Sequence, residues 1–418
     1  MMNSLHRLSA SWRVTLVAAI GAMINYGDRA AFSSVLPAIG KDLELSGTTM
    51  GLLGSLFLWS YALGSPVAGS LADRFSRRST IIWSLALWSL VMVGTGFANS
   101  VIILCVSRVA LGLTECPYLP ASIALVGDSH PPSTRARGIG ILLIGIRIGV
   151  LVGGAASGWI ADHLGWRPVF WILGALGIAL AVLFNLPAFL PRSSSPVHVR
   201  MEKFRPSAAL KYLIRTPSYL LILTKVIFVG VASWNFFTWL PYYFHEVFHM
   251  NLASGGFAGT FLPEFTGLIG LVAGAWLSDR AAARNVRRRM LLEGLNYLAA
   301  APFLLFFVGQ PSLATISTAL ILYGLFRGLG DANEQSIVSE IIPSCHRATA
   351  IGIMNTCATM AGGMGVLVGG MLKDKVGLPI VFAGLSGTIF FAAVVLVFGY
   401  FAFVGRDIER AAAFQPAS

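Results

Sequence analysis

The chain has 418 residues, of which 56% are hydrophobic and only 11% are charged, and 45 are glycine. A soluble chain carries about a quarter charged residues, so this composition excludes a soluble globular protein, and with four cysteines it excludes a disulfide scaffold. The net charge of +12 leaves nucleic-acid binding open until the basic residues are placed.

Apolar runs of about 20 residues recur along the chain, and each can cross roughly 30 Å of hydrocarbon as a helix. The first run contains Asp28 and Arg29 and is too long for a signal peptide, so we expect an uncleaved first span. The expected fold is an all-α membrane protein of twelve transmembrane helices. The predicted spans are 14–37, 48–72, 79–98, 101–127, 138–162, 168–190, 217–244, 254–278, 290–309, 312–342, 348–373 and 379–404.

The basic residues predict the orientation of these spans. With the N-terminus inside, 21 of the 30 Lys and Arg residues fall in cytoplasmic segments, whereas only Lys41, Arg167 and Lys375 fall outside. Positive charge concentrates in cytoplasmic loops, so we expect both termini in the cytoplasm. Loops of a few cations each form no basic face, which argues against nucleic-acid binding.

One long polar connection, residues 191–216, divides the chain into two sets of six spans. We expect an N-terminal bundle at 1–190, this cytoplasmic linker, and a C-terminal bundle at 217–418. The halves resemble one another, because Pro131-x-x-x-Arg135-Ala-x-x-Ile-Gly-Ile recurs as Pro343-x-x-x-Arg347-Ala-x-x-Ile-Gly-Ile. Two parallel repeats are typical of transporters in which two bundles pack about a central cavity and work by alternating access.

The loop after the second span reads Gly69-Ser-Leu-Ala-Asp73-Arg74-Phe-Ser-Arg77-Arg78. It resembles the signature loop of the major facilitator superfamily. A carboxylate at a helix end beside flexible arginines can pair with a facing bundle and hold one conformer closed. We therefore assign a gating role to Asp73, Arg74 and Arg77.

Within that superfamily the chain most resembles the anion:cation symporters, a branch that includes D-galactonate and hexuronate carriers. The resemblance lies in Asn25-Tyr26-Gly27-Asp28-Arg29-Ala30, in Ser55-x-Phe57-x-Trp59-x-Tyr61 and in Arg108-x-x-x-Gly112-x-x-Glu115-Cys116-Pro117. Spinster-type lysolipid carriers also place Asp-Arg in the first span and Arg and Glu in the fourth. A spinster-like carrier of lysolipids or other amphiphiles is therefore the alternative.

Charged residues inside the membrane are functional candidates, because burying each costs several kcal/mol. Arg108 and Glu115 are two helical turns apart and share a face, whereas the adjacent Asp28 and Arg29 diverge by about 100°. We expect Arg29 to bind a substrate carboxylate and Asp28 and Glu115 to carry protons, supported by Arg108. The alternative is a structural network that pairs Asp28 with Arg108 or Arg29 with Glu115.

Further candidate site residues are spread over both halves of the chain. In the C-terminal half, Arg327 and Asp331 are four residues apart, as expected of a gating or structural pair, and Glu264 is a candidate second titrating group. Glycines 145, 149, 153, 154 and 158 predict close helix packing in the fifth span. The remaining predicted substrate-binding residues are Tyr26, Tyr61, Arg147, Trp234, Asn235 and Asn355.

His245-Glu246-Val247-Phe248-His249 matches the zinc-protease string H-E-x-x-H. It lies at the outer end of the seventh span with no clear third ligand, so we interpret it as a polar helix end. We expect no enzyme, no bound metal and no cofactor. The predicted function is proton-coupled symport of a small organic anion, by a monomer in the lipid bilayer of the cytoplasmic (inner) membrane.

Overall fold

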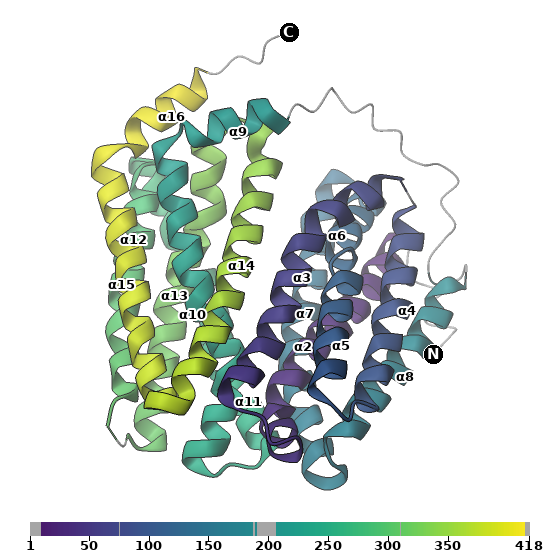
Figure 1. The fold of residues 1–418 in the computed structure, drawn as a ribbon. Helices are drawn as coiled ribbons and strands as arrows, with labels where there is room; N and C mark the ends of the chain where they lie inside the picture. Colours follow the sequence, from purple (N-terminus) through teal and green to yellow (C-terminus); the bar gives the residue numbers. More distant parts are fainter. Residues whose placement is uncertain (1–9, 75, 187–188, 190–205, 310, 414–418) are drawn as a thin grey trace. The chain divides into compact units, whose positions relative to one another are not determined.

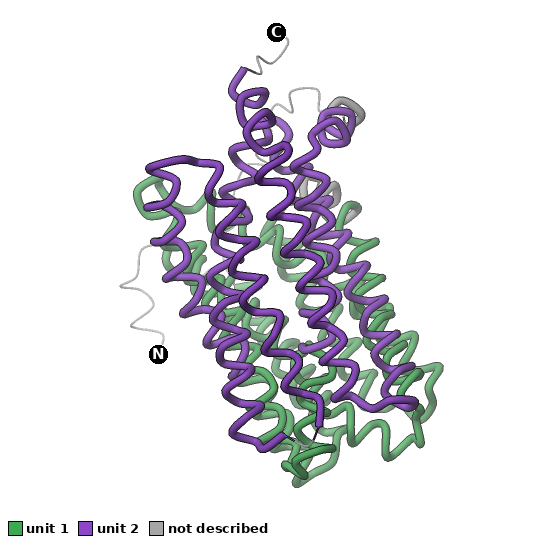
Figure 2. The backbone as a smooth tube through the Cα atoms, turned by 90° about the vertical axis from the view of Figure 1, so that its left-hand side faces the viewer, with its two compact units in different colours: residues 1–200, 237–260 green, residues 201–236, 261–418 purple. Residues whose placement is uncertain are grey.

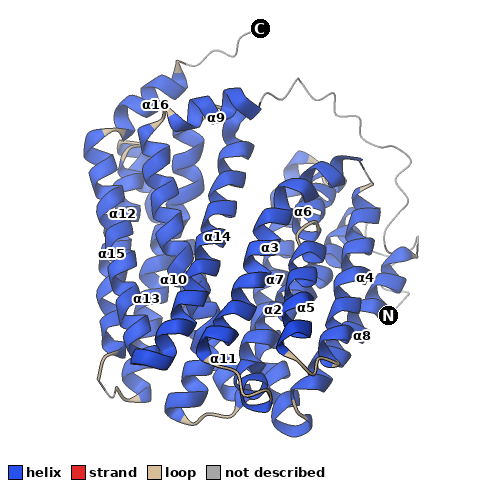
Figure 3. Ribbon diagram, in the orientation of Figure 1, coloured by secondary structure: helices blue, strands red, loops and turns tan. Residues whose placement is uncertain are grey.

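The chain is helical in the computed structural model, which describes residues 10–74, 76–186, 189, 206–309 and 311–413. Figure 3 shows helices joined by short loops, and no strand occurs within these ranges. Long apolar segments are expected to be helical, because in a bilayer a helix satisfies its backbone hydrogen bonds internally.

The first compact unit comprises residues 1–200 together with 237–260, which form the end of α10 and the start of α11 (Figure 2). Its helices are joined by short loops and pack mainly in the pairs α2 with α7 and α4 with α8. The helices are α2 (Ala10–Asp42), α3 (Gly47–Arg74), α4 (Arg77–Gly96), α5 (Val101–Glu115), α6 (Tyr118–Ser129), α7 (Pro132–Leu164) and α8 (Trp166–Asn185).

The second compact unit comprises residues 201–236 and 261–418. In it α12 packs against α13 and α15 (Figure 1). Its helices are α9 (Pro206–Ile214), α10 (Pro217–Phe248), α11 (Leu252–Arg284), α12 (Arg288–Ala300), the 3-10 helix η1 (Ala301–Phe307), α13 (Leu313–Ile341), α14 (Ser344–Val376), α15 (Leu378–Ala402) and α16 (Val404–Ala412). Helix α9 falls inside the predicted linker, whose residues 191–205 lie outside the described residues.

Ten helical segments within the described ranges are long and apolar enough to cross a membrane. They correspond to the third to twelfth predicted spans, with α5 and α6 forming one segment and α12 and η1 another. The first two predicted spans coincide with α2 and α3, which have 33 and 28 residues but do not belong to this group. A multi-pass all-helical membrane fold is therefore confirmed, whereas the count of twelve spans and the orientation of the termini stay predictions.

Close packing of α2 against α7 depends on glycine. A Cβ atom on Gly149 would lie 2.1 Å from the carbonyl oxygen of Met23, and one on Gly153 would lie 2.4 Å from the Cα of Gly27. The two backbones are in contact here, as the glycine spacing in α7 predicts. This contact requires that no side chain be present at these positions. This packing positions the polar segment of α2 that contains Asp28 and Arg29.

Candidate functional site

The centre of the first unit holds a buried ion pair between Arg29 of α2 and Glu115 of α5. Arg29 Nε donates to Glu115 Oε2 at 2.8 Å, and the two side chains are 3% and 0% exposed. Of the two pairings that the sequence left open, the structure shows Arg29 with Glu115. Both charged groups are buried, so the attraction between them must compensate for the loss of their hydration.

Aromatic side chains surround the Arg29 guanidinium. Its carbon lies 4.5 Å from the ring centre of Tyr26, 4.5 Å from that of Tyr61 and 5.1 Å from that of Phe57. Arg29 Nη2 also donates to Asn25 Oδ1 at 3.2 Å. Cation–π contacts stabilise a partly desolvated guanidinium while leaving its edge available for carboxylate. The structure thus brings the predicted residues Tyr26, Arg29 and Tyr61 together.

Arg108 occupies a different environment from the one expected. Its guanidinium carbon lies 3.9 Å from the ring centre of Phe32 and 4.7 Å from that of Phe57, and its Nε donates to the Leu53 carbonyl at 3.4 Å. Within the described residues Arg108 forms no salt bridge, although a supporting ion pair was predicted. It shares Phe57 with Arg29, so it adds a second positive charge beside the pair.

Asp28 points away from Arg29, as the 100° divergence of adjacent helical residues predicts. Its Oδ2 accepts a hydrogen bond from Trp88 Nε1 of α4 at 3.0 Å. The residue is 1% exposed, and its Oδ1 has no hydrogen-bond partner among the described residues. Sequence reasoning missed Trp88. The available signal was a tryptophan in the middle of a span, where its N–H needs a buried partner.

The chain positions Glu115 by ending α5 at that residue. Pro117 follows two residues later and supplies no backbone N–H, so the helix is interrupted before α6 begins at Tyr118. Side chains bond to carbonyls near the interruption: Ser84 Oγ of α4 donates to the Thr114 carbonyl at 2.5 Å, and Cys116 Sγ donates to the Leu113 carbonyl at 3.2 Å. The carbonyl groups of Leu113 and Thr114, next to the break, are therefore bonded inside the protein.

The second unit holds a separate charge cluster. Arg327 Nη2 donates to Glu264 Oε1 at 3.1 Å, and Arg327 Nε lies 3.9 Å from Asp331 Oδ2. The predicted Arg327–Asp331 contact along one helix face is therefore present. Lys225 and Glu293 also belong to this cluster, and sequence reasoning did not single them out. The signal was available, because both are charged residues inside predicted spans.

The other predicted site residues lie apart from these clusters or face a different environment. Trp234 and Asn235 pack against glycines of α14, since Cβ atoms on Gly362 and Gly365 would lie 2.1 Å and 2.8 Å from them. Asn355 and Arg147 are exposed on α14 and α7. Their roles stay predictions.

Of the predicted gating residues in the loop after α3, only Arg77 has a described side chain. It forms a salt bridge with Asp128 of α6, and its Nη1 donates to the Ala124 carbonyl at 3.1 Å. The side chains of Asp73 and Arg74 lie outside the described residues.

The H-E-x-x-H string does not form two ligands on one helix face. Helix α10 ends at Phe248, and His249 has a left-handed φ of 53°. His245 Nδ1 lies 2.7 Å from the Met250 carbonyl oxygen, so this ring nitrogen bonds to the chain that follows the helix end. The geometry agrees with a polar helix end.

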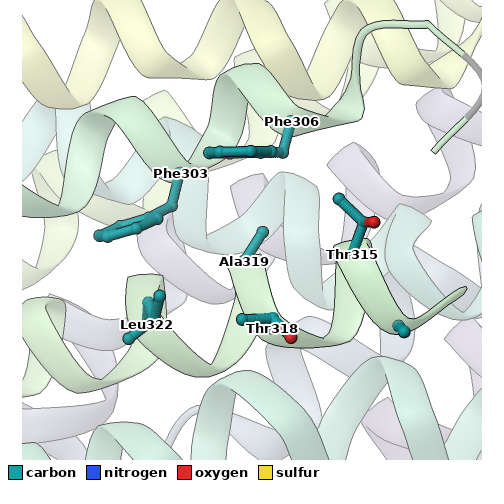
Figure 4. Close-up of a pocket in the computed structure, with 7 residues that line it drawn as sticks. Phe303, Phe306, Thr315, Thr318, Ala319 and Leu322 are labelled. Atoms are coloured by element: carbon teal, nitrogen blue, oxygen red, sulfur yellow. The ribbon is translucent and has the colours of Figure 1, made fainter. Parts of the chain in front are cut away.

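A cavity of about 380 Å³ lies in the second unit, where α13 begins beside η1. In Figure 4, Phe303 and Phe306 face Thr315, Thr318, Ala319 and Leu322. Its lining carries no charged side chain. This cavity therefore offers no counterion for an anion, unlike the surroundings of Arg29.

Comparisons with known proteins agree with this architecture. The Major Facilitator Superfamily profile matches residues 18–324 and 281–415. The chain is 26% identical over 402 residues to the "Hexuronate transporter" of Bacillus subtilis, covering 94% of this chain and 93% of that one. It is 23% identical over 439 residues to the "Probable galactarate/D-glucarate transporter GudP" of Escherichia coli, covering 97% and 95%. A solved bacterial homologue of the human lysosomal transporter Spinster, inward-facing and unoccupied, has a TM-score of 0.76 at 22% identity, covering 98% and 99%.

Proposed function

The chain belongs to the major facilitator superfamily, and on that premise we propose that it is a secondary active transporter of a small organic anion, a sugar acid or related carboxylate. Two matched relatives carry names of transporters for such acids. The proposal includes twelve spanning helices, both termini in the cytoplasm, the inner membrane as location and a monomeric working unit. The excess of Lys and Arg in the predicted cytoplasmic segments supports this orientation.

The Arg29–Glu115 ion pair is the observation that carries the substrate class. Arg29 is permanently charged, and its planar guanidinium suits bidentate binding of a carboxylate. Glu115 already presents a carboxylate oxygen to it at 2.8 Å. A substrate carboxylate can therefore take the place of the Glu115 carboxylate, while Tyr26 and Tyr61 keep the guanidinium in position.

Protons would couple to transport through Glu115 and Asp28. Protonation of Glu115 removes its negative charge and weakens its hold on Arg29, so the guanidinium becomes available to the anion. Asp28 is buried beside Trp88 and forms no salt bridge among the described residues, and ionising a carboxyl group in such a place costs several kcal/mol. Proton binding and anion binding then favour one another, as symport requires.

Binding measurements on purified protein test the substrate proposal. A thermal-shift screen of sugar acids, dicarboxylates and lysolipids identifies a ligand, and Arg29→Ala should abolish the shift. Arg29→Lys should retain only weak binding, because an ammonium group lacks the planar pair of donors. Arg167→Ala, which removes a half-buried cation paired with Asp42 at the other end of α2, is the matched control and should bind normally. Stabilisation by lysolipids alone would contradict the proposal and favour a spinster-like amphiphile carrier.

Transport measurements in proteoliposomes test the coupling. Glu115→Gln should still exchange internal for external anion, since exchange requires no net proton movement. It should lose accumulation driven by a pH gradient. Full pH-driven accumulation by this variant would show that Glu115 is not a coupling residue.

A further inference from the structure

Two carboxylates in the second unit share one buried lysine. Lys225 Nζ of α10 forms salt bridges with Glu293 of α12 and with Glu334 of α13, the second at 2.7 Å. The side chains of Lys225 and Glu293 are both 0% exposed, whereas that of Glu334 is 24% exposed. A single ammonium group can neutralise only one of the two carboxylates.

The same cluster extends along α13 to further carboxylates. The Tyr297 hydroxyl of α12 donates to Asp331, and Arg327 contacts both Asp331 and Glu264. Lys225 Nζ also lies 4.9 Å from the ring centre of Tyr297, which joins the two parts. The connected groups are four carboxyl groups, at Glu264, Glu293, Asp331 and Glu334, and two cations, Lys225 and Arg327.

This charge balance differs from that of the first unit. There the two carboxylates Asp28 and Glu115 are matched in number by the two cations Arg29 and Arg108, although only Arg29 and Glu115 form a salt bridge among the described residues. In the second unit Glu293 and Glu334 share the single ammonium group of Lys225, so one negative charge stays uncompensated there if both carboxyl groups are ionised. Isolated negative charge in a low-dielectric interior costs several kcal/mol per ion. The side chains of Glu334, Glu264 and Asp331 are 24%, 27% and 39% exposed, whereas that of Glu293 is 0% exposed, so uncompensated negative charge costs most at Glu293.

Glu293 is the member least compensated for its degree of burial. Its Oε1 forms the salt bridge with the Lys225 ammonium, and its Oε2 has no hydrogen-bond partner among the described residues. The groups that face it are Lys225 from α10, Tyr297 from its own helix, and Asp331 and Glu334 from α13. Helix α15, which packs against α12, carries no Asp, Glu, Lys, Arg or His.

A separate set of charges lies closer to the end of the same helices. Arg289 of α12 pairs with Glu340 of α13 and, at 3.0 Å, with Asp279 of α11. This set also has more carboxylates than cations, so it supplies no spare positive charge to Glu293.

The depth of the site allows exchange with water. Along their helices, Lys225, Glu293 and Glu334 lie roughly 8 to 12 Å from the ends at Pro217, Arg288 and Ile341. The charge pattern predicts that these three ends face the cytoplasm. Glu334 is partly exposed and touches the same ammonium as Glu293, so it connects the buried carboxyl to the surroundings.

From this geometry we propose that Glu293 is a proton-binding site in the second unit, separate from the Arg29–Glu115 site and exchanging its proton by way of Glu334. Lys225 then pairs with Glu334 while Glu293 carries the proton. Loss of that proton places two carboxylates on one ammonium and changes the attraction between α10, α12 and α13. The site goes beyond the proposed function, because it requires neither the anion nor Arg29.

Infrared difference spectroscopy of the full-length protein in lipid vesicles, without any substrate, tests the site. A protonated carboxyl group has a C=O stretching band that a carboxylate lacks, and we expect wild-type protein to lose such a band on raising the pH. Glu293→Gln should abolish one component of this band, whereas Glu115→Gln should keep it. A wild-type band that is absent, or one that Glu293→Gln leaves unchanged, would overturn the proposal. A band that sodium ions remove at constant pH would also overturn it, by assigning the excess negative charge to a metal cation.

Lys225→Met keeps the test decisive if Glu293→Gln does not fold. Without the ammonium, neither Glu293 nor Glu334 has its cation, so the protonated-carboxyl band should gain a second component of about the size that Glu293 contributes. An unchanged band in Lys225→Met would contradict the sharing of one lysine by two carboxylates. Glu340→Gln, which alters the neighbouring Arg289 set, is the matched control and should leave the Glu293 component in place.

Discussion

Replacement of Gly149 by alanine tests whether backbone contact between α2 and α7 positions the charged segment of α2. The added methyl carbon would lie 2.1 Å from the carbonyl oxygen of Met23 and 2.8 Å from the Met23 Cα. These are backbone atoms, so no side-chain rotation relieves the overlap. The helices must separate, and Met23 lies less than two turns before Arg29 on the same helix.

The expected magnitude follows from these distances. Carbon contacts are comfortable at about 3.5–4.0 Å, so relief at Gly149 requires a local shift of more than about 1 Å. Overpacking of this kind costs about 1–3 kcal/mol. The higher helix propensity of alanine offsets up to about 1 kcal/mol. We therefore expect Gly149→Ala to lose about 0–2 kcal/mol against wild type, to be about 1–3 kcal/mol less stable than an alanine variant without the overlap, and to bind the anion more weakly.

Gly140→Ala on the same helix is the matched control. No atom lies within 4 Å of a Cβ placed on Gly140, so only the propensity gain applies there and stability should stay equal or rise slightly. Thermal unfolding in detergent and binding of an identified anion measure the two variants side by side. If Gly149→Ala proves as stable as Gly140→Ala, close contact between α2 and α7 does not stabilise the first unit.

Three further predictions concern other contacts. Trp88→Phe should destabilise the protein by about 1.5–3 kcal/mol, because it removes the hydrogen bond to Asp28. The loss should be smaller when Asp28→Leu is also present. An equal loss in that background would show that the hydrogen bond does not stabilise the protein. Asp162→Ala should lower the free energy of unfolding by about 0.5–2 kcal/mol, because the Asp162 carboxylate caps the N-terminus of α11 by accepting from the N–H groups of Leu252 and Ala253 at 3.0 Å each. Asp162→Asn should retain most of that stability. An Asp162→Ala variant as stable as wild type would argue against the cap. Glu246→Gln should leave uptake unchanged in protein that metal analysis finds free of zinc, whereas loss of uptake together with bound zinc would revive the protease interpretation.

Much of the site could be predicted from local pattern. Asp28 and Arg29 are adjacent on a helix, so their divergence follows from the helical period, and the structure places them toward Trp88 and Glu115 respectively. The spacing of Arg108 and Glu115 predicted one shared face. Which residues would pair did not follow, because both pairings satisfied the charges and only the relative placement of α2 and α5 selects one.

Two kinds of residue escaped prediction. Trp88 becomes important only because Asp28 lies beside its N–H, a contact over 60 residues of chain. Lys225 and Glu293 come from two helices that are far apart in the sequence, and each could equally have been an isolated charge near a helix end. Arg108 shows the reverse, since a predicted ion-pair partner stacks on Phe32 and Phe57 instead.

The sequence by itself determined the membrane environment, the helical class and the repeat. Low charge, long apolar runs and internal similarity are properties of the chain that do not depend on how its helices meet. Only the tertiary structure decided which buried charges compensate one another: Glu115 pairs with Arg29, and Glu293 shares Lys225 with Glu334. The physical reason is that electrostatic energy inside a protein depends on distances of a few ångströms between side chains that are far apart in the sequence.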